Sequence, residues 1–361
     1  MPRAREIGIR IGVLPTGPTN SVLDVTGVGL GHVTLVRDEP APPDGRGVAR
    51  TGVTTLLLAE DAYDRPLAAG GAVLNGAGEC TGFLTAAELG VVETPMYLTS
   101  TMQLGRVYDA ACQIALEHHP AVAGDVVIPV VGECDDSFLN DCRRMQVEAE
   151  DVWASYADAV ASRGATSPPA EGSVGAGTGM SCLGFKGGIG TASRVTTEGH
   201  TVAVLLLTNF GERHRLTVAG VPVGRLLPAA EAATVRPAGS CIGVVVTDAP
   251  VDAADFARLA RRVGLGLART GSTAHHGSGE IFLAASTTSR GDRDGRTESG
   301  LPVSGRGLDT LFEAVVDASE EAVLNSMLGS TTTTGRDGNT SEGLDPTVVA
   351  RLVAEADRAG H

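Results

Sequence analysis

The hydrophobic positions of this chain gather into short, nearly continuous runs separated by glycine-rich or charged segments. In the runs at 201–208 (TVAVLLLT) and 240–247 (SCIGVVVT), apolar residues occur at almost every position instead of every second one. Such a run predicts a central strand that is buried on both faces of its sheet. Further strands are predicted at 53–59, 125–131 and 280–285.

A second pattern, with apolar residues three or four positions apart, predicts helices at 106–119, 148–163, 252–269 and 308–328. In the third of these helices Asp252 stands at the N-cap position. The apolar stripe of that helix comprises Phe256, Leu259, Val263 and Leu267.

A final helix is predicted to begin at Asp345-Pro346, because proline is favoured at the first helical position. The glycine-rich stretch 70–82 is predicted to be a loop. The stretches 287–307 and 330–343 are rich in Gly, Ser, Thr and charge, and are predicted to be mobile. Strands and helices mix without strict alternation, which favours an α/β or α+β layered sandwich formed by residues 1–361 as one domain.

Charge limits the classes of partner. The 361 residues carry a net charge of −15, with no cluster of Lys or Arg. This disfavours binding to nucleic acid and to anionic membranes, which depends on basic side chains. The sequence also shows no apolar leader and no run of membrane-spanning length, so we expect a cytoplasmic protein. The six cysteines form no C-x-x-C pair and are expected to be reduced thiols.

The familiar cofactor motifs are missing. Residues 27–31 (GVGLG) lack the dinucleotide-binding spacing, and 175–190, although it contains Lys186, lacks the order of a phosphate-binding loop. His275 and His276 are adjacent, and the eight histidines form no metal-ligand pattern. We therefore predict no metal and no cofactor. A G-x-S-x-G hydrolase motif is also absent.

One dipeptide could carry nucleophilic chemistry. A segment predicted to be flexible, Arg236-Pro237-Ala238, leads to Gly239-Ser240, and Ser240 begins a buried strand. A serine that becomes the first residue of a chain has its own α-amine, with a pKa of roughly 8, as a base beside its hydroxyl. This requires cleavage of the Gly239–Ser240 bond by an N→O acyl shift. Taken alone, however, Gly-Ser is common in turns, and a simple turn is the default interpretation.

Motifs on both sides of Ser240 change this balance. They occur in order from near residue 6 to about residue 290, and the clearest are DVTGV at 24–28, PVVGE at 129–133, ND at 140–141, GTGM at 177–180, FKGGIGTAS at 185–193, GVPVG at 220–224, GSCIGVVVTDAP at 239–250, LARR at 259–262, GLARTGS at 266–272 and GSGEIF at 277–282. In these motifs the chain resembles the aminopeptidases typified by L-aminopeptidase D-Ala-esterase/amidase and the β-peptidyl aminopeptidases.

The resemblance implies that Ser240 is the nucleophile, released by self-cleavage into an α chain of residues 1–239 and a β chain of residues 240–361. It implies that Ser278 and Glu280 orient and tune the Ser240 hydroxyl and amine. Alternation along a strand puts these two side chains on one face, although an ordinary strand entry has the same pattern.

The resemblance further implies that Asn209 donates to the oxyanion and that Glu133 receives the free ammonium group of the substrate. Phe138 stands in the predicted substrate site where some relatives have a tyrosine, which affects the choice between α- and β-peptides. The His275-His276 pair replaces smaller residues and either lines the pocket or lies on the surface.

The fold implied is a four-layer α-β-β-α sandwich, similar to N-terminal-nucleophile hydrolases but with different connectivity. The activity implied is hydrolysis of small peptides, amides or esters through a seryl ester, by a homo-oligomer of processed units. Two alternatives remain: an endo-acting hydrolase of linear amide oligomers on the same scaffold, and an unprocessed relative without catalytic activity.

Overall fold

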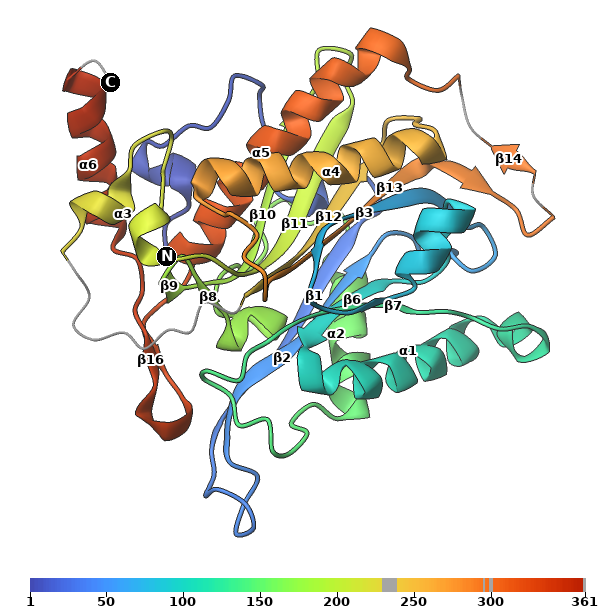
Figure 1. Cartoon of the computed structure of the whole chain (residues 1–361). Coiled ribbons are helices and arrows are strands. Elements are labelled where there is room, and N and C mark those ends of the chain that lie inside the picture. The colour runs from blue at the N-terminus through green and yellow to red at the C-terminus, as the bar shows by residue number, and fades with distance from the viewer. Residues whose placement is uncertain (229–238, 295, 299–300, 360–361) are drawn as a thin grey trace.

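Two β-sheets packed face to face between two layers of helices form the protein (Figure 1). This computed structural model describes residues 1–228, 239–294, 296–298 and 301–359. The predicted flexible segment Arg236-Pro237-Ala238 lies outside the described residues. The first sheet has the strand order β1-β2-β6-β7-β4, and the second has the order β10-β11-β12-β13-β3-β5 with β14 paired to β13. The α-β-β-α sandwich is therefore confirmed.

The strands of the first sheet are β1 (Gly29–Asp38), β2 (Val48–Leu57), β4 (Cys80–Thr81), β6 (Met96–Ser100) and β7 (Val130–Cys134). Those of the second sheet are β3 (Leu67–Gly76), β5 (Val91–Val92), β10 (Gly188–Val195), β11 (Thr201–Asn209), β12 (Ser240–Thr247), β13 (Gly279–Gly291) and β14 (Thr297–Glu298). Two small ribbons comprise β8 (Ser181–Cys182), β9 (Phe185–Lys186), β15 (Thr333–Thr334) and β16 (Thr340–Ser341).

The α-helices are α1 (Leu104–His118), α2 (Ala149–Ala161), α3 (Val223–Leu226), α4 (Ala253–Thr270), α5 (Leu308–Leu328) and α6 (Pro346–Ala359). Helices α1 and α2 cover the first sheet, and α4 and α5 cover the second, as Figure 1 shows. The predicted stripe of α4 is buried against the second sheet, and Asp252 does occupy its N-cap, although its carboxylate makes no capping hydrogen bond. None of the described helices is long and apolar enough to cross a membrane.

Strand β12 lies at the centre of the second sheet, between β11 and β13. Ile242, Val244 and Val246 belong to the core between the two sheets, whereas Cys241 and Val245 pack in the core under the helices. The prediction of a strand buried on both faces is thus confirmed. A strand in this position has little freedom, so the residue at its start is held rigidly.

Four stretches differ in part from the sequence predictions. The stretch 70–82 was predicted to be a loop, but β3 runs through it to Gly76. Glycine is needed there because a Cβ at Gly70 would lie 2.7 Å from the backbone nitrogen of Ala257 in α4. The small residues therefore reflect close packing of a helix on a strand, not a loop.

The strand predicted at 125–131 begins only at Val130, because Pro129 has no N–H to donate and Val126 lies exposed outside the sheet. In the stretch predicted to be mobile at 287–307, β13 continues to Gly291, where Arg290 pairs with β3 and β14. The stretch at 330–343 contains the hairpin of β15 and β16.

Candidate active site

Ser240, Asn209 and Gly279 meet where three central strands of the second sheet begin or end. Ser240 pairs with Asn209 across the antiparallel strand β11, and with Gly279 across the parallel strand β13. The start of a strand lies beside the start of its parallel neighbour and the end of its antiparallel neighbour. The topology therefore brings three distant parts of the sequence together at this point.

The Ser240 hydroxyl is buried, and it has no hydrogen-bond partner among the described residues. The carbonyl just before it, that of Gly239, accepts a hydrogen bond from the Gly279 backbone N–H at 3.1 Å. Position 239 leaves no space for a side chain, since a Cβ there would lie 2.5 Å from the Asn209 carbonyl oxygen and 2.8 Å from the Cα of Phe210. The peptide bond that precedes Ser240 is thus fixed between β11, against which Gly239 packs, and β13, whose Gly279 N–H donates to its carbonyl.

Asn209 has its side chain on the same face as Ser240, because directly paired residues of a sheet share a face. Its Oδ1 accepts from the Ser181 backbone N–H at 2.9 Å, and its Nδ2 donates to the Asp135 carbonyl at 2.8 Å. The amide is therefore fixed in orientation. Since the NH₂ group has two hydrogens, one donor remains for a further acceptor.

Ser278 and Glu280 form a pair of their own, in which the buried Ser278 hydroxyl donates to Glu280 Oε1. Burial raises the pKa of Glu280, while the Ser278 hydroxyl and the nearby His275 oppose the rise. The register puts Gly279 beside Ser240, so the Glu280 side chain shares its face with Cys241 and not with Ser240. The pair adjoins the main chain around Ser240 but makes no hydrogen bond to its hydroxyl.

Glu133 lies at the end of β7, in the other sheet. Its Oε1 accepts from the Glu79 backbone N–H at 2.8 Å, and its Oε2 accepts from the Thr101 hydroxyl. Burial raises the pKa of Glu133, and Asp135 and Glu79 add to the rise. No described cation pairs with this carboxylate. A buried carboxylate with only neutral donors is suited to a positively charged ligand.

The carboxylate of Glu133 faces the edge at which Ser240 lies. A Cβ at Gly78 would be 3.1 Å from Glu133 Oε1 and 3.6 Å from the Cα of Gly279, the residue paired with Ser240. The two sheets thus contribute opposite walls of one site. Phe138 follows in a turn and is half-buried, with its carbonyl accepting from Asn339 Nδ2 at 2.8 Å; its predicted contact with substrate stays a prediction.

Sequence reasoning missed two residues next to this site. Cys134 lies beside Ser240: burial raises the pKa of its thiol well above the usual value, and the nearby Ser240 hydroxyl opposes this, although the two groups do not form a hydrogen bond of normal geometry. Asn75 on β3 donates to the turn that carries Ser278. The only sequence signal for Cys134 is its position directly after Glu133. The sequence holds no signal for Asn75.

Lys186, the only lysine of the sequence, has a structural role in the glycine-rich stretch. It is fully buried, and its Nζ donates to the carbonyls of Gly177, Met180 and Gly187 at 2.7–2.9 Å. Its donors are thus engaged by the main chain of the same stretch. The described residues contain no group of three or more His, Cys, Asp or Glu side chains arranged to hold a metal.

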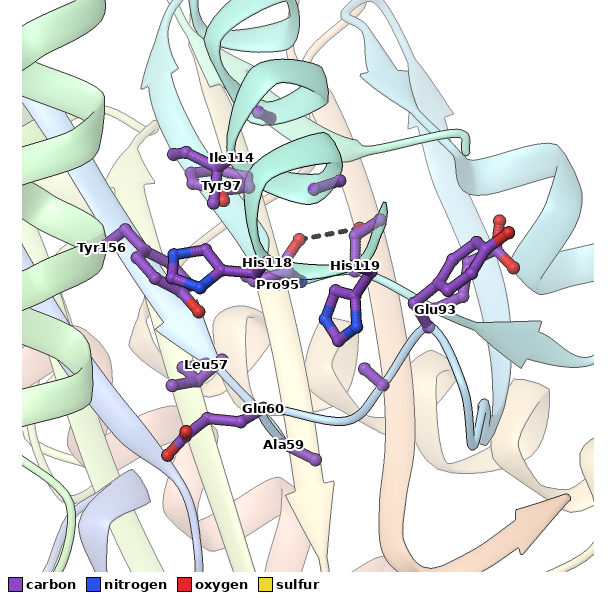
Figure 2. Close-up of a pocket in the computed structure, with 15 residues that line it drawn as sticks. Leu57, Ala59, Glu60, Glu93, Pro95, Tyr97, Ile114, His118, His119 and Tyr156 are labelled. Atoms are coloured by element: carbon purple, nitrogen blue, oxygen red, sulfur yellow. Dashed lines mark hydrogen bonds between the residues drawn. The ribbon is translucent and has the colours of Figure 1, made fainter. Parts of the chain in front are cut away.

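A separate pocket lies under the end of α1 (Figure 2). The His118 ring packs there against Tyr156 in a tilted arrangement with ring centroids 4.9 Å apart, and Tyr97 and Pro95 line the pocket from the beginning of β6. Thr99, further along β6, pairs with Glu133, so the pocket lies toward the opposite end of the strand. Its free volume of about 20 Å³ has room for a water molecule and not for a peptide.

Comparisons with known proteins agree on one family. The profile of peptidase family S58 matches residues 20–341. The beta-peptidyl aminopeptidase BapA of Sphingosinicella microcystinivorans is 39% identical over 363 residues, which cover 95% of this chain and 89% of that protein.

Solved structures show the same similarity. The PH0078 protein of Pyrococcus horikoshii OT3 superposes with a TM-score of 0.89 and 38% identity, over 99% of each chain. The L-aminopeptidase D-Ala-esterase/amidase of Ochrobactrum anthropi gives a TM-score of 0.88 and 33% identity, again over 99% of each chain. That enzyme is described as a prototype for the serine aminopeptidases and a new variant among the Ntn hydrolase fold.

Proposed function

Because the chain belongs to peptidase family S58 and is an aminopeptidase or amidase, we propose that it is a self-processing enzyme whose nucleophile is Ser240. The observation that carries the proposal is the geometry of the Gly239–Ser240 bond. The Gly239 carbonyl accepts a hydrogen bond from Gly279, while a buried hydroxyl without a described partner follows directly. A hydrogen bond to a carbonyl oxygen stabilises the negative charge that forms when the carbonyl is attacked.

In processing, Ser240 Oγ attacks the Gly239 carbonyl carbon and transfers its proton to the departing nitrogen. The C–N bond breaks, and an ester joins the Gly239 acyl group to the Ser240 oxygen. Water then hydrolyses this ester, leaving a carboxylate on Gly239 and a free α-amine on Ser240. The chain becomes residues 1–239 and 240–361.

In catalysis, the same hydroxyl attacks the carbonyl of a substrate amide or ester, with the new α-amine as its base. The remaining N–H of Asn209 and neighbouring backbone N–H groups stabilise the oxyanion. The leaving group departs with a proton, and water hydrolyses the seryl ester. The side chains of Ser278 and Glu280, which lie beside the main chain at Ser240, adjust the pKa of its amine.

The substrates we propose are small peptides, amides or esters with a free amino end. Glu133 supports this class, since its buried carboxylate has two neutral donors and no described cation. An ammonium group bound there would supply the missing positive charge. An endo-acting hydrolase has no need of such a group, so cleavage of a dipeptide amide but not of its N-acetylated form is the expected result.

Mass spectrometry of the purified protein tests the self-processing. We expect two polypeptides, the smaller beginning at Ser240, and an uncut chain after long incubation would refute the mechanism. Residues 240–361 contain no lysine. An amine-selective reagent in denaturant should therefore label this fragment once, at its new α-amine. Ser240→Ala is the control and should give a folded, uncut and inactive chain.

The processed enzyme is further proposed to be a cytoplasmic homo-oligomer. The six cysteines are all free thiols, which is usual in a reducing compartment. The oligomer is proposed from the family resemblance. Cell fractionation and light scattering of the processed enzyme test the two statements; an exported protein or a monomer would contradict them.

A further inference from the structure

The side chain of Asn75, near the end of β3, holds the turn from which Ser278 and Glu280 project. The two hydrogens of its Nδ2 are shared among the carbonyls of His275 at 3.1 Å, His276 at 3.2 Å and Ser278. We propose that Asn75 is a positioning residue of the reaction, which acts by fixing the Ser278–Glu280 pair beside Ser240. This inference rests on the proposed role of Ser240 as nucleophile.

A β-bulge brings Asn75 to this place. Glu280 pairs with Asn75, whereas the next residue, Ile281, pairs with Val73, so Leu74 is an extra residue in β3. Bulges bend a strand and change the direction of its side chains, and they are common beside active sites. At the bulge Asn75 is the residue paired with Glu280, and its side-chain nitrogen reaches the carbonyls of the turn before it.

The turn that Asn75 holds has few other restraints. His276 and Gly277 are exposed, and Ala274 has a φ of 46°, in the left-handed region that residues other than glycine rarely adopt. Within the turn, the Ser278 N–H donates to the His275 carbonyl at 2.8 Å. Asn75 adds a tie from another strand to the peptide groups just before Gly279. Loss of this tie would allow Ser278 to move relative to Glu280.

The residues after Asn75 connect the turn to the other wall of the site. Gly76 pairs with Gly279, and a Cβ on Gly279 would lie 2.6 Å from the Ala77 carbonyl oxygen. The Glu79 backbone N–H then donates to Glu133. The segment 75–79 therefore touches both the Ser278–Glu280 pair and the carboxylate proposed to bind the substrate amine.

The titratable groups around Glu280 are His275 on the turn, Cys241 on β12 and Cys134 on β7. Asn75 adds a neutral donor to this set. A carboxylate at position 75 would put a negative charge beside Glu280 and would set acceptor oxygens against three carbonyls. Asn75→Asp is therefore a sharper test than Asn75→Ala, since it changes charge and donors at almost constant shape.

The experiment compares Asn75→Ala and Asn75→Asp with the wild type, with Val73→Ala on the same strand as the matched control. We expect Asn75→Ala to slow self-cleavage and lower kcat at least tenfold, with KM changed less than twofold. Asn75→Asp should lower kcat further and move the acidic limb of the kcat–pH profile to higher pH, because a neighbouring negative charge raises the pKa of Glu280. Val73→Ala should process and turn over like the wild type.

Wild-type self-cleavage and kcat in both Asn75 variants would overturn the proposal, as would a loss of thermal stability with kcat per folded molecule unchanged. An uncut wild-type chain would instead refute the proposed function itself. Hydrogen exchange gives a readout without catalysis. In the uncut Ser240→Ala background, Asn75→Ala should speed amide exchange at 276–280 at least tenfold, and unchanged exchange there would also overturn the proposal.

Discussion

At position 239 the backbone lies so close to β11 that only glycine fits. A Cβ would be 2.5 Å from the Asn209 carbonyl oxygen. Gly239→Ala must therefore displace the bond proposed to be cut, and we expect self-cleavage at least tenfold slower, measured as the rate at which intact mass disappears. The matched control is Gly124→Ala, away from the site, where a Cβ meets no atom within 4 Å. Equal cleavage rates in the two variants would show that the fit at residue 239 is irrelevant.

The ionisation of Glu133 predicts how kcat/KM depends on pH. Its carboxylate must be ionised to bind an ammonium group, and burial raises its pKa above the ordinary value of about 4.3. As pH falls through this raised pKa the carboxyl becomes neutral, so kcat/KM should decline at a higher pH than an exposed Glu would cause. Glu133→Gln should raise KM roughly 10- to 100-fold, the worth of one charge-assisted hydrogen bond, and should remove this limb.

The control is Glu79→Gln, which alters an exposed carboxylate but keeps the backbone N–H that donates to Glu133. Its KM should stay within about twofold of the wild type. A similar KM increase in both variants would mean that general negative charge, and not a specific carboxylate, attracts the substrate.

From the sequence, the residues of the candidate site could be predicted only where they belong to a recognisable motif. Ser240, Ser278 and Glu280 stand in motifs at strand starts, and the structure does bring these starts to one edge. Cys134 and Asn75 could not be found this way. The contact of Cys134 depends on how the two sheets cross, and that of Asn75 on one extra residue in β3, which has no signature in the pattern of apolar positions.

Among the elements, the stretch 175–190 depends on one buried lysine. Lys186 donates to three carbonyls of this stretch; burial lowers its pKa to about 7, and the field of the buried Asp136 opposes the fall. In Lys186→Met these buried carbonyls lose their donor. We expect a loss of about 1–3 kcal/mol in the free energy of unfolding, the usual cost of leaving a buried acceptor without its partner.

Urea denaturation of the uncut Ser240→Ala background measures this change without interference from cleavage. Arg144→Met, which removes an exposed cation, is the control and should leave the urea midpoint unchanged. A wild-type midpoint in Lys186→Met would contradict the structural role of the lysine.

Elements were predictable where burial was complete. Strands β11 and β12 are buried on both faces, so their sequences are continuous apolar runs, and α4 follows its apolar stripe. Prediction failed for β3, because glycine and alanine serve there to admit a helix, and the same composition is typical of loops. Local composition cannot distinguish these two uses of small residues; the tertiary contact decides.

At the scale of the whole molecule, the proposed cut divides the chain in sequence but not in space. Strands β12 and β13 would belong to the C-terminal piece, yet they lie between β11 and β3 of the N-terminal piece. Helix α5 likewise packs on β10 and β11 (Figure 1). Cleavage of this one peptide bond would break none of the strand pairings among the described residues.

Glu321 on α5 links the two pieces by ion pairs. It forms an ion pair with Arg194 on β10 at 2.7 Å, with both side chains fully buried, and a second one with Arg5 at 3.0 Å. Both of these arginines belong to the N-terminal piece. Separation of the pieces would expose these charges unpaired together with the edges of two central strands, which is very unfavourable.

We therefore expect the cleaved protein to remain one particle. Size-exclusion chromatography and native mass spectrometry should give the same mass for the wild type after cleavage and for uncut Ser240→Ala, and two fragments should separate only in denaturant. Glu321→Gln, which leaves Arg194 buried with a neutral partner, should lower the urea midpoint of both forms. Release of residues 240–361 under native conditions would contradict the interleaved arrangement, because a strand pair at the centre of a sheet cannot leave without unfolding it.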